Sequence, residues 1–229
     1  AQGKPWTPRT GLDIEVNALW YNALRYGVDL LKAAEPKNPL WKKWESIADK
    51  VAESFEPAFY DKQQDRFFDY VNEWEKNTMV RPNMMLAAAL PYSPMCETLQ
   101  KRAFDIATSE LLTSRGIRSL SPNSEVYQGV CIGNHNQRER AYHNGTVFQW
   151  LMMFYAELAV KLFGKAAGSN LEEIYNGFED AIQDNGVGTI SEVYDGNPPF
   201  EARGCISQST SVGALLYVHY LISRKEAKK

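Results

Sequence analysis

Two carboxylates, Glu192 and Asp195, lie between a glycine turn and a proline pair in the stretch GTISEVYDGNPPF, residues 188–200. Side chains of an extended segment alternate in direction, so we expect Ile190 and Val193 to pack while Glu192 projects elsewhere. A carboxylate held rigidly there could act as a general base. Glycoside hydrolysis uses two carboxylates across the scissile bond, roughly 6.5 to 9.5 Å apart when water is the nucleophile. The simpler alternative is that both acids only cap a turn.

A second set of candidate residues lies in the mostly apolar stretch PRTGLDIEVNALWYNAL, residues 8–24. These residues are Glu15, Asn17 and Trp20. Polar groups buried in an apolar helix cost free energy unless they have partners. A sugar hydroxyl or an arginine such as Arg9 would supply the partner that Glu15 needs. The alternative for Glu15 is simple complementation of the helix dipole near the helix start.

The stretch YHNGTVFQW, residues 142–150, joins a polar loop to an apolar helix. Asn144 is in position to cap the start of that helix. Tyr142 and His143 come before it, where side chains point into whatever the loops enclose. Trp150 is expected to be a core aromatic residue.

Several other chemistries have no motif in this sequence. His135 and His143 are eight positions apart in a loop, His219 falls on an expected core helix, and no HExxH pattern occurs, so no metal site is expected. The sequence also has no GxSxG elbow, no GxGxxG pattern and no P-loop. We therefore expect neither a nucleotide cofactor nor a catalytic triad.

The composition of the chain argues against two further classes of partner, nucleic acids and membranes. The net charge is -3 with acids and bases interspersed, which argues against nucleic acid. The longest apolar run, residues 84–92, is far shorter than the roughly 20 residues that cross a bilayer. Three widely spaced cysteines, without paired CxxC spacing, fit reduced thiols in a cytoplasm. Six tryptophans and twelve tyrosines offer apolar faces on which sugar rings stack.

Helical periodicity predicts the elements that position these residues. The first helix is expected to be largely buried. A short β-hairpin is expected within residues 59–71, where a polar centre separates aromatic ends. The expected helices cover residues 12–31, 39–55, 82–90, 94–113, 145–163, 170–183 and 207–223.

Residues 116–144 read as one long irregular region rich in Gly, Ser, Asn and Arg. Loops of that length inside a compact domain are usually functional or disordered, and the tyrosines and charges here favour function. Helices thus come in pairs that are joined alternately by short turns and by long polar loops. This alternation predicts an all-α fold, an α/α toroid whose long loops gather on one rim. A helical solenoid is the alternative, although no fixed-period repeat supports it.

Five blocks, taken in order, resemble the C-terminal glucosidase region of glycogen debranching enzymes, the amylo-alpha-1,6-glucosidase family. They are TPRTGLDIEVNALWYNAL, RPNMMLAAAL, TSRGIRSLSPNSEVYQG, RAYHNGTVFQW and GTISEVYDGNPPFEARGCISQSTSV, and the likeness runs from about residue 6 to residue 217. The resemblance implies an (α/α)6 barrel with short β-hairpins in its rim loops. It also implies hydrolysis of α-1,6-linked glucose in a glycogen-like α-glucan, with inversion and without a metal.

The same resemblance assigns roles to individual residues. Glu192 matches the glutamate that acts as the catalytic base and deprotonates the attacking water. Positions that line the glucose site match Arg9, Glu15, Asn17, Trp20, Tyr142 and His143. On the same rim, Tyr127, Arg138 and Asp195 are further substrate-binding candidates.

Three features depart from the family pattern. The general acid is expected in a segment upstream of Ala1, so the isolated chain is expected to have little or no activity. Phe148 replaces a tryptophan of the family, and Thr210 replaces an aromatic residue, which could shift substrate preference. The seven or eight expected helices are fewer than the twelve of a closed barrel. The whole chain, residues 1–229, therefore reads as the C-terminal part of one glucosidase domain, whose exposed helix faces could favour self-association.

Two other classes of function remain open. The same rim could bind an oligosaccharide without cleaving it, as a glycan-binding module. A sugar epimerase of the same fold type would need several histidines on the rim, and His135 and His143 are the two available.

Overall fold

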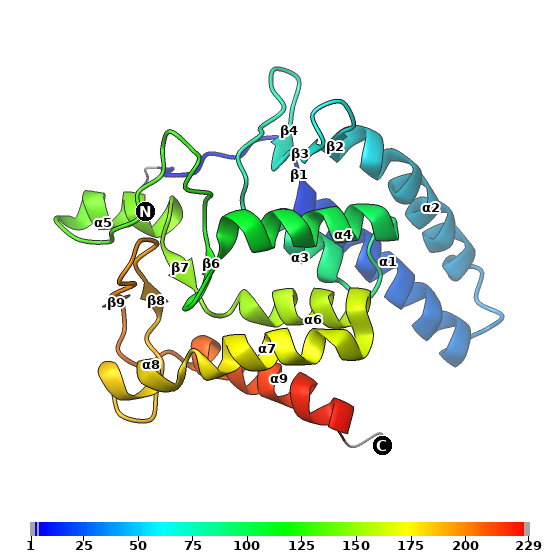
Figure 1. The fold of residues 1–229 in the computed structure, drawn as a ribbon. Helices are drawn as coiled ribbons and strands as arrows, with labels where there is room; N and C mark the ends of the chain where they lie inside the picture. Colours follow the sequence, from blue (N-terminus) through cyan, green and yellow to red (C-terminus); the bar gives the residue numbers. More distant parts are fainter. Residues whose placement is uncertain (1–2, 4, 227–229) are drawn as a thin grey trace.

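The computed structural model describes residue 3 and residues 5–226, and seven of its helices build two layers (Figure 1). In the inner layer, α3 packs between α1 and α6, and α6 packs against α9. In the outer layer, α2 packs on α1, α4 packs on α3 and α6, and α7 packs on α9. The inner helices are α1 (Ile14–Ala34), α3 (Asn83–Ala89), α6 (Met152–Phe163) and α9 (Ser209–Glu226). The outer helices are α2 (Leu40–Phe59), α4 (Glu97–Ile106) and α7 (Gly168–Asn176).

Apolar residues at helical spacing bring the two layers together. Tyr155 on α6 is fully buried, stacks on Phe104 of α4 with ring centroids 4.9 Å apart, and has its hydroxyl 3.0 Å from Oγ1 of Thr108. Burying a side chain of this size stabilises the fold by about 1.5–3 kcal/mol. Gly27 lets α1 approach α2 closely, because a Cβ there would lie 3.1 Å from the ring of Trp44. A π-helical turn, Ala107–Leu111, continues α4, and a 3-10 turn, Gly164–Ala167, joins α6 to α7.

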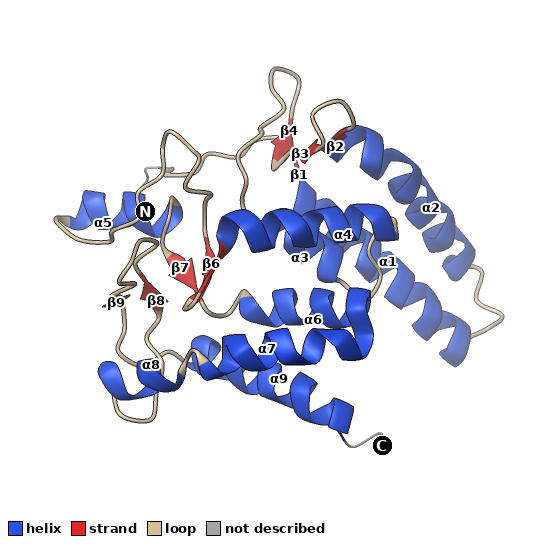
Figure 2. Cartoon of the chain, viewed as in Figure 1, coloured by secondary structure: helices blue, strands red, loops and turns tan. Residues whose placement is uncertain are grey.

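The strands gather at one end of the helices (Figure 2). Five of them form an antiparallel sheet in the order β5-β6-β7-β8-β9. Two smaller sheets pair β1 with β4 and β2 with β3. The strands are β1 (Leu12–Asp13), β2 (Tyr60–Asp61), β3 (Arg66–Phe67), β4 (Tyr70–Val71), β5 (Leu112–Thr113), β6 (Gly116–Arg118), β7 (Val147–Phe148), β8 (Val193–Tyr194) and β9 (Ala202–Arg203). Two short helices, α5 (His135–His143) and α8 (Glu179–Asp184), lie beside the larger sheet (Figure 1).

Most of the expected helices are present, and the hairpin expected within residues 59–71 is confirmed as the β2–β3 pair. The helix expected to begin at residue 145 begins at Met152, because residues 147–148 pair with β6 and β8 instead. The helix expected over 170–183 is interrupted between α7 and α8. The region 116–144 is less irregular than expected, since it contains β6 and α5.

Two local expectations were wrong. Asn144 does not begin a helix but ends α5, where its amide Nδ2 donates to the carbonyl of Arg140 at 3.0 Å. The first helix is not largely buried, because one side of α1 remains uncovered. Its exposed apolar side chains, each between 45% and 56% accessible, are Val16, Leu19, Trp20, Tyr26 and Leu30. No helix within the described residues is long and apolar enough to cross a membrane.

Candidate functional site

The candidate site lies where the inner helices begin. Asn83 in the first turn of α3 and Leu151 just before α6 line one cavity, and Thr210 in the first turn of α9 lines a second cavity that adjoins it. One cavity has a volume of about 190 Å³ and the other about 480 Å³. They share three aromatic side chains, so they form one trough, whose shared residues are Tyr142, Phe148 and Trp150.

Glu192 lines the larger end of the trough, immediately before β8. As expected, Ile190 and Val193 are buried while Glu192 stays partly exposed. Its Oε1 accepts a hydrogen bond from the Tyr142 hydroxyl at 2.9 Å, and its Oε2 accepts one from the Cys205 N–H at 3.0 Å. The carboxylate is thus held from two sides by elements far apart in the sequence.

Those two donors fix the charge of Glu192. The Cys205 N–H, and after it the Tyr142 hydroxyl, hold the pKa of Glu192 below its usual value, against the opposing effect of burial. Burial and the bond to Glu192 raise the pKa of Tyr142, so its hydroxyl keeps its proton and donates it. Gly204 has φ +70°, and a Cβ there would lie 2.5 Å from Oε2 of Glu192. Glycine at this position therefore leaves room for the carboxylate.

We expect Tyr142→Phe to raise the pKa of Glu192 toward its ordinary value, because the variant removes a donor that favours the ionised form. Carbon-detected NMR of ¹³C-glutamate-labelled protein, with the Glu192 signal assigned by its loss in Glu192→Gln, measures this directly. Tyr70→Phe is the matched control, since Tyr70 contacts Glu75 away from the trough. An unchanged Glu192 titration in Tyr142→Phe would show that the hydroxyl does not set its charge.

Asp195 is 3% exposed and its carboxylate is occupied by protein groups. Arg203 donates to it from Nη2 at 2.7 Å and from Nε at 3.1 Å, and the N–H of Cys131 donates at 2.7 Å. This arrangement ties β8 to β9 and to the 116–134 segment. In the described structure Asp195 positions the loop that carries Glu192.

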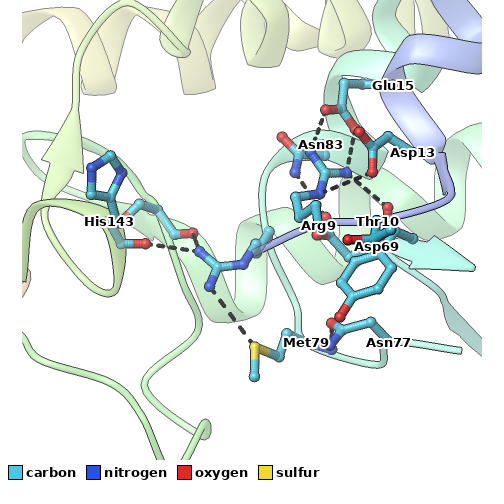
Figure 3. Close-up of polar contacts among 12 residues, drawn as sticks. Arg9, Thr10, Asp13, Glu15, Asp69, Asn77, Met79, Asn83 and His143 are labelled. Carbon is cyan, nitrogen blue, oxygen red and sulfur yellow. Dashed lines mark hydrogen bonds and ion pairs between the residues drawn. The ribbon is translucent and has the colours of Figure 1, made fainter. Parts of the chain in front are cut away.

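Arg9 forms the centre of an ionic cluster at the smaller end of the trough (Figure 3). Its Nη2 donates to Oε2 of Glu15 at 2.8 Å and to the carbonyl of Asp69 at 2.9 Å. Its Nε lies 3.0 Å from Oδ2 of Asp69 and 3.4 Å from Oδ1 of Asp13. The expectation that an arginine such as Arg9 partners Glu15 is therefore confirmed.

Three carboxylates thus share one guanidinium. Burial raises the pKa of Asp69, and the positive charge of Arg9 opposes that rise. Asn83 also donates from Nδ2 to Oδ1 of Asp69 at 2.8 Å. Burial likewise raises the pKa of Asp13, with Arg9 opposing it. Arg9 is the group that keeps this acidic cluster compatible with a folded chain.

His143 ends α5 and lines the smaller cavity beside Arg9. Burial lowers its pKa, so the ring is neutral near pH 7 even though Glu139 lies 3.8 Å away. The half-buried guanidinium of Arg81 fixes the backbone here by donating from Nη1 to the His143 carbonyl at 2.8 Å. Its Nη2 donates to Oδ1 of Asn144 at 2.9 Å.

The other expected site residues lie outside the two cavities. Asn17 donates from Nδ2 to the carbonyl of Asp13 at 2.8 Å, one helical turn back. Trp20 is 53% exposed on the uncovered side of α1. The hydroxyl of Tyr127 donates to Asn197 at 3.0 Å, and Arg138 donates to the carbonyl of Gly133 at 2.5 Å. The structure therefore brings together Arg9, Tyr142, His143 and Glu192, with Glu15 held behind Arg9.

Sequence reasoning missed several residues of the trough. Trp150 was expected in the core, yet it is 36% exposed and shared by both cavities. Arg81 had a readable signal, because a lone arginine stands in the apolar stretch MVRPNMML. Other lining residues gave no such signal: Asn83, Gln208 and Tyr217. Across residues 3 and 5–226, no group of three or more His, Cys, Asp or Glu side chains is placed to hold a metal ion.

Comparison with known proteins gives two positive findings. A family profile described as amylo-alpha-1,6-glucosidase matches residues 1–217. The fold is similar to that of the neutral trehalase Nth1 from Saccharomyces cerevisiae, with a TM-score of 0.66 and 14% sequence identity. That similarity covers 93% of this chain and 40% of the trehalase chain. No curated protein matches by sequence. The expected fold, an (α/α)6-type arrangement present in part with small sheets at the rim, is confirmed, and the described helices do not close a barrel.

Proposed function

Since this chain belongs to the amylo-alpha-1,6-glucosidase family, we propose that it supplies the glucose site and the general base of a glycoside hydrolase that cleaves α-1,6-linked glucose from glycogen-like α-glucans with inversion. Its family and its fold are those of a glycoside hydrolase-type domain. The observation that carries the proposal is the ionised carboxylate of Glu192 in a trough bordered by aromatic rings. In this proposal, Glu192 is the general base.

A general base must be ionised before it can accept a proton from water. The hydrogen bonds from Cys205 and Tyr142 meet that condition near neutral pH, because both stabilise the carboxylate. They also fix its direction, so a water in the larger cavity would lie within reach of a carboxylate held in one orientation. Attack by that water from the face opposite the leaving group inverts the anomeric configuration.

The rest of the trough suits a glucose unit. Trp150, Phe148 and Tyr217 supply ring faces of the kind on which the apolar side of a sugar stacks. Arg9 and the neutral ring of His143 supply polar groups at the other end. We assign Glu15 to holding Arg9 and Asp195 to holding the base loop. Contacts from Asn17, Trp20, Tyr127 and Arg138 to more distant sugar units remain part of the proposal.

An inverting glycosidase also needs a general acid. Among the described residues that line the two cavities, Glu192 is the carboxylic acid. We therefore propose that the acid is supplied from outside this set. This chain would then bind an α-1,6-glucoside but cleave it slowly, because the departing oxygen would lack a proton.

The experiment that tests the proposal uses a substrate that needs no acid. Fluoride leaves α-glucosyl fluoride without protonation, so the chain is expected to release fluoride from it while leaving isomaltose intact. A fluoride electrode measures the rate, and ¹H NMR of the first product identifies β-glucose, the inverted anomer. α-Glucose as the first product would contradict the inverting mechanism. An absence of both cleavage and sugar binding would contradict the whole proposal.

One observation favours a second candidate function. Because a single carboxylic acid lines the described trough, the same site could bind a glycan without cleaving it. Binding of isomaltose by NMR, without release of fluoride from α-glucosyl fluoride, would identify a glycan-binding module.

The wider setting is also a proposal. We place the protein in glycogen metabolism in the cytoplasm, in keeping with three free cysteines. Self-association through the uncovered side of α1, and through Leu216 and Tyr220 on α9, belongs to the same proposal.

A further inference from the structure

Trp74 lies outside the trough, in the turn that follows β4, and is 81% exposed. A cavity of about 450 Å³ lies beside it. Its wall is formed by two short segments, with the residues Thr10, Gly11, Leu12, Val71, Asn72, Glu73 and Trp74. A single exposed apolar side chain is common on protein surfaces and does not mark a binding site by itself. Here the ring borders a cavity, and the two features together make a candidate site.

The turn that carries Trp74 is well ordered by hydrogen bonds. Oδ1 of Asn72 accepts from the N–H groups of Trp74 and Glu75 at 2.9 and 2.8 Å. The N–H of Asn72 donates to the carbonyl of Glu75 at 3.0 Å, and the Tyr70 hydroxyl contacts the Glu75 carboxylate. The backbone under the exposed ring is therefore fixed, which lowers the entropy that a ligand would cost on binding.

The wall of this cavity is connected to the Arg9 cluster through the backbone. Nδ2 of Asn72 donates to the carbonyl of Thr10 at 2.9 Å, and Thr10 directly follows Arg9. Gly11 has φ +118°, and a Cβ there would lie 2.3 Å from the carbonyl of Val71, so the two segments meet at backbone distance. The β1–β4 pair thus joins the Trp74 turn to the residues around the smaller end of the trough.

We propose that Trp74 is a stacking platform for a glucose unit of an α-glucan chain, outside the unit held in the trough. The inference rests on the proposed function, because it takes the trough as the site of the terminal glucose. An exposed ring beside polar groups on Asn72, Glu73 and Thr10 matches the chemistry of a sugar, which has one apolar face and a hydroxylated edge. Trp74 would then select longer glucans over short ones.

The test is isothermal titration calorimetry of the chain with isomaltose and with branched gluco-oligosaccharides of increasing length. In Trp74→Ala we expect the affinity for the long oligosaccharides to fall by about threefold to tenfold, the range of a lost aromatic contact. The affinity for isomaltose should stay the same, and Trp74→Phe should keep most of the affinity for long chains. Tyr26→Ala is the matched control, because Tyr26 is 56% exposed and lines none of the three cavities.

A second readout does not depend on affinity. The six tryptophans give separate indole N–H signals in a ¹H–¹⁵N spectrum, and Trp74→Phe assigns the signal of Trp74. That signal should shift with long oligosaccharides and not with isomaltose.

The outcomes separate the two proposals. Equal affinities of the parent chain and Trp74→Ala at every length would overturn the platform and leave the proposed function standing. If Trp74→Ala loses the same factor of affinity for isomaltose as for the long oligosaccharides, Trp74 does not contact a glucose unit outside the trough. Absence of binding to any sugar by the parent chain would overturn the proposed function, and the platform with it.

Discussion

Replacing Glu192 with Gln is expected to lower the rate of fluoride release from α-glucosyl fluoride by about 10²- to 10⁴-fold. The substrate needs no general acid, so the loss reports on the base alone. Gln has the shape of Glu and cannot accept a proton from water at neutral pH. The measurement is the initial rate at saturating substrate, with binding of isomaltose followed in parallel.

The fold should survive this change. A Gln oxygen can still accept one hydrogen bond from Tyr142 or Cys205, so the loss of stability should be about 1 kcal/mol. Glu201→Gln is the matched control, because Glu201 is an exposed acid in the neighbouring β8–β9 loop and lines neither cavity of the trough. A Glu192→Gln protein that releases fluoride at nearly the parent rate would remove Glu192 from the mechanism.

Replacing Arg9 with Met is expected to lower the free energy of unfolding by about 3–5 kcal/mol. The variant keeps the length of the side chain but removes the charge that Glu15, Asp13 and Asp69 share. The side chain of Asp69 is 3% exposed, so its charge would remain buried without its ion-pair partner. Urea unfolding followed by circular dichroism measures the loss.

The control for Arg9 is another arginine ion pair with more exposure. Arg25 donates to Asp49 at 2.7 Å, and Asp49 is 55% exposed, so Arg25→Met should cost about 1 kcal/mol or less. The double variant Arg9→Met with Asp69→Asn should recover part of the loss, because it removes the stranded charge. A single Arg9→Met variant as stable as Arg25→Met would show that the cluster contributes little.

The pH dependence of this loss has a definite sign. Burial raises the pKa of Asp69 in the folded chain, and removing Arg9 would raise it further. A carboxyl group with a raised folded pKa destabilises the fold where it is ionised, and this penalty disappears as the pH falls and the group takes up a proton. The difference between Arg9→Met and the parent should therefore be largest near neutral pH and should shrink in acid.

Local sequence patterns were sufficient for most of the long helices and for part of the site. The expected burial of Ile190 and Val193 and the partial exposure of Glu192 are confirmed, but strict alternation does not explain them, because it would place Ile190 and Glu192 on the same face. The cost of burying Glu15 without a partner correctly pointed to Arg9. The inference about Glu15 depends on residues close together in the chain and on elementary energetics, which a single sequence contains.

The five-stranded sheet could not be read in the same way. Its strands are two or three residues long, so none contains enough residues for an alternating pattern to be recognised. Their pairing depends on segments far apart in the chain, such as Ile117 with Phe148 and Val147 with Tyr194. The donors to Glu192 and the ion pair of Asp195 with Arg203 follow from that pairing and were missed with it.

The prediction that the first helix is largely buried was wrong for a different reason. Apolar residues on several sides of a helix predict burial, but they do not say which part of the protein covers each side. The described helices bury Ile14 and Ala18 and leave Trp20 and Leu30 exposed. The pattern therefore predicted correctly that this side of α1 is apolar and wrongly that it is buried.

The same long-range sheet has a consequence for how the molecule folds. Bringing β6 next to β7, and β7 next to β8, closes long loops and so costs conformational entropy before the strand contacts can stabilise the sheet. The hairpin of α1 and α2 joins near neighbours and carries a much smaller closure cost. Helical pairs should therefore form early, and the strands that orient Glu192 should form late. We therefore expect these strands to open at a lower free energy than the hairpin of α1 and α2, and a sugar bound in the trough would protect them from local unfolding.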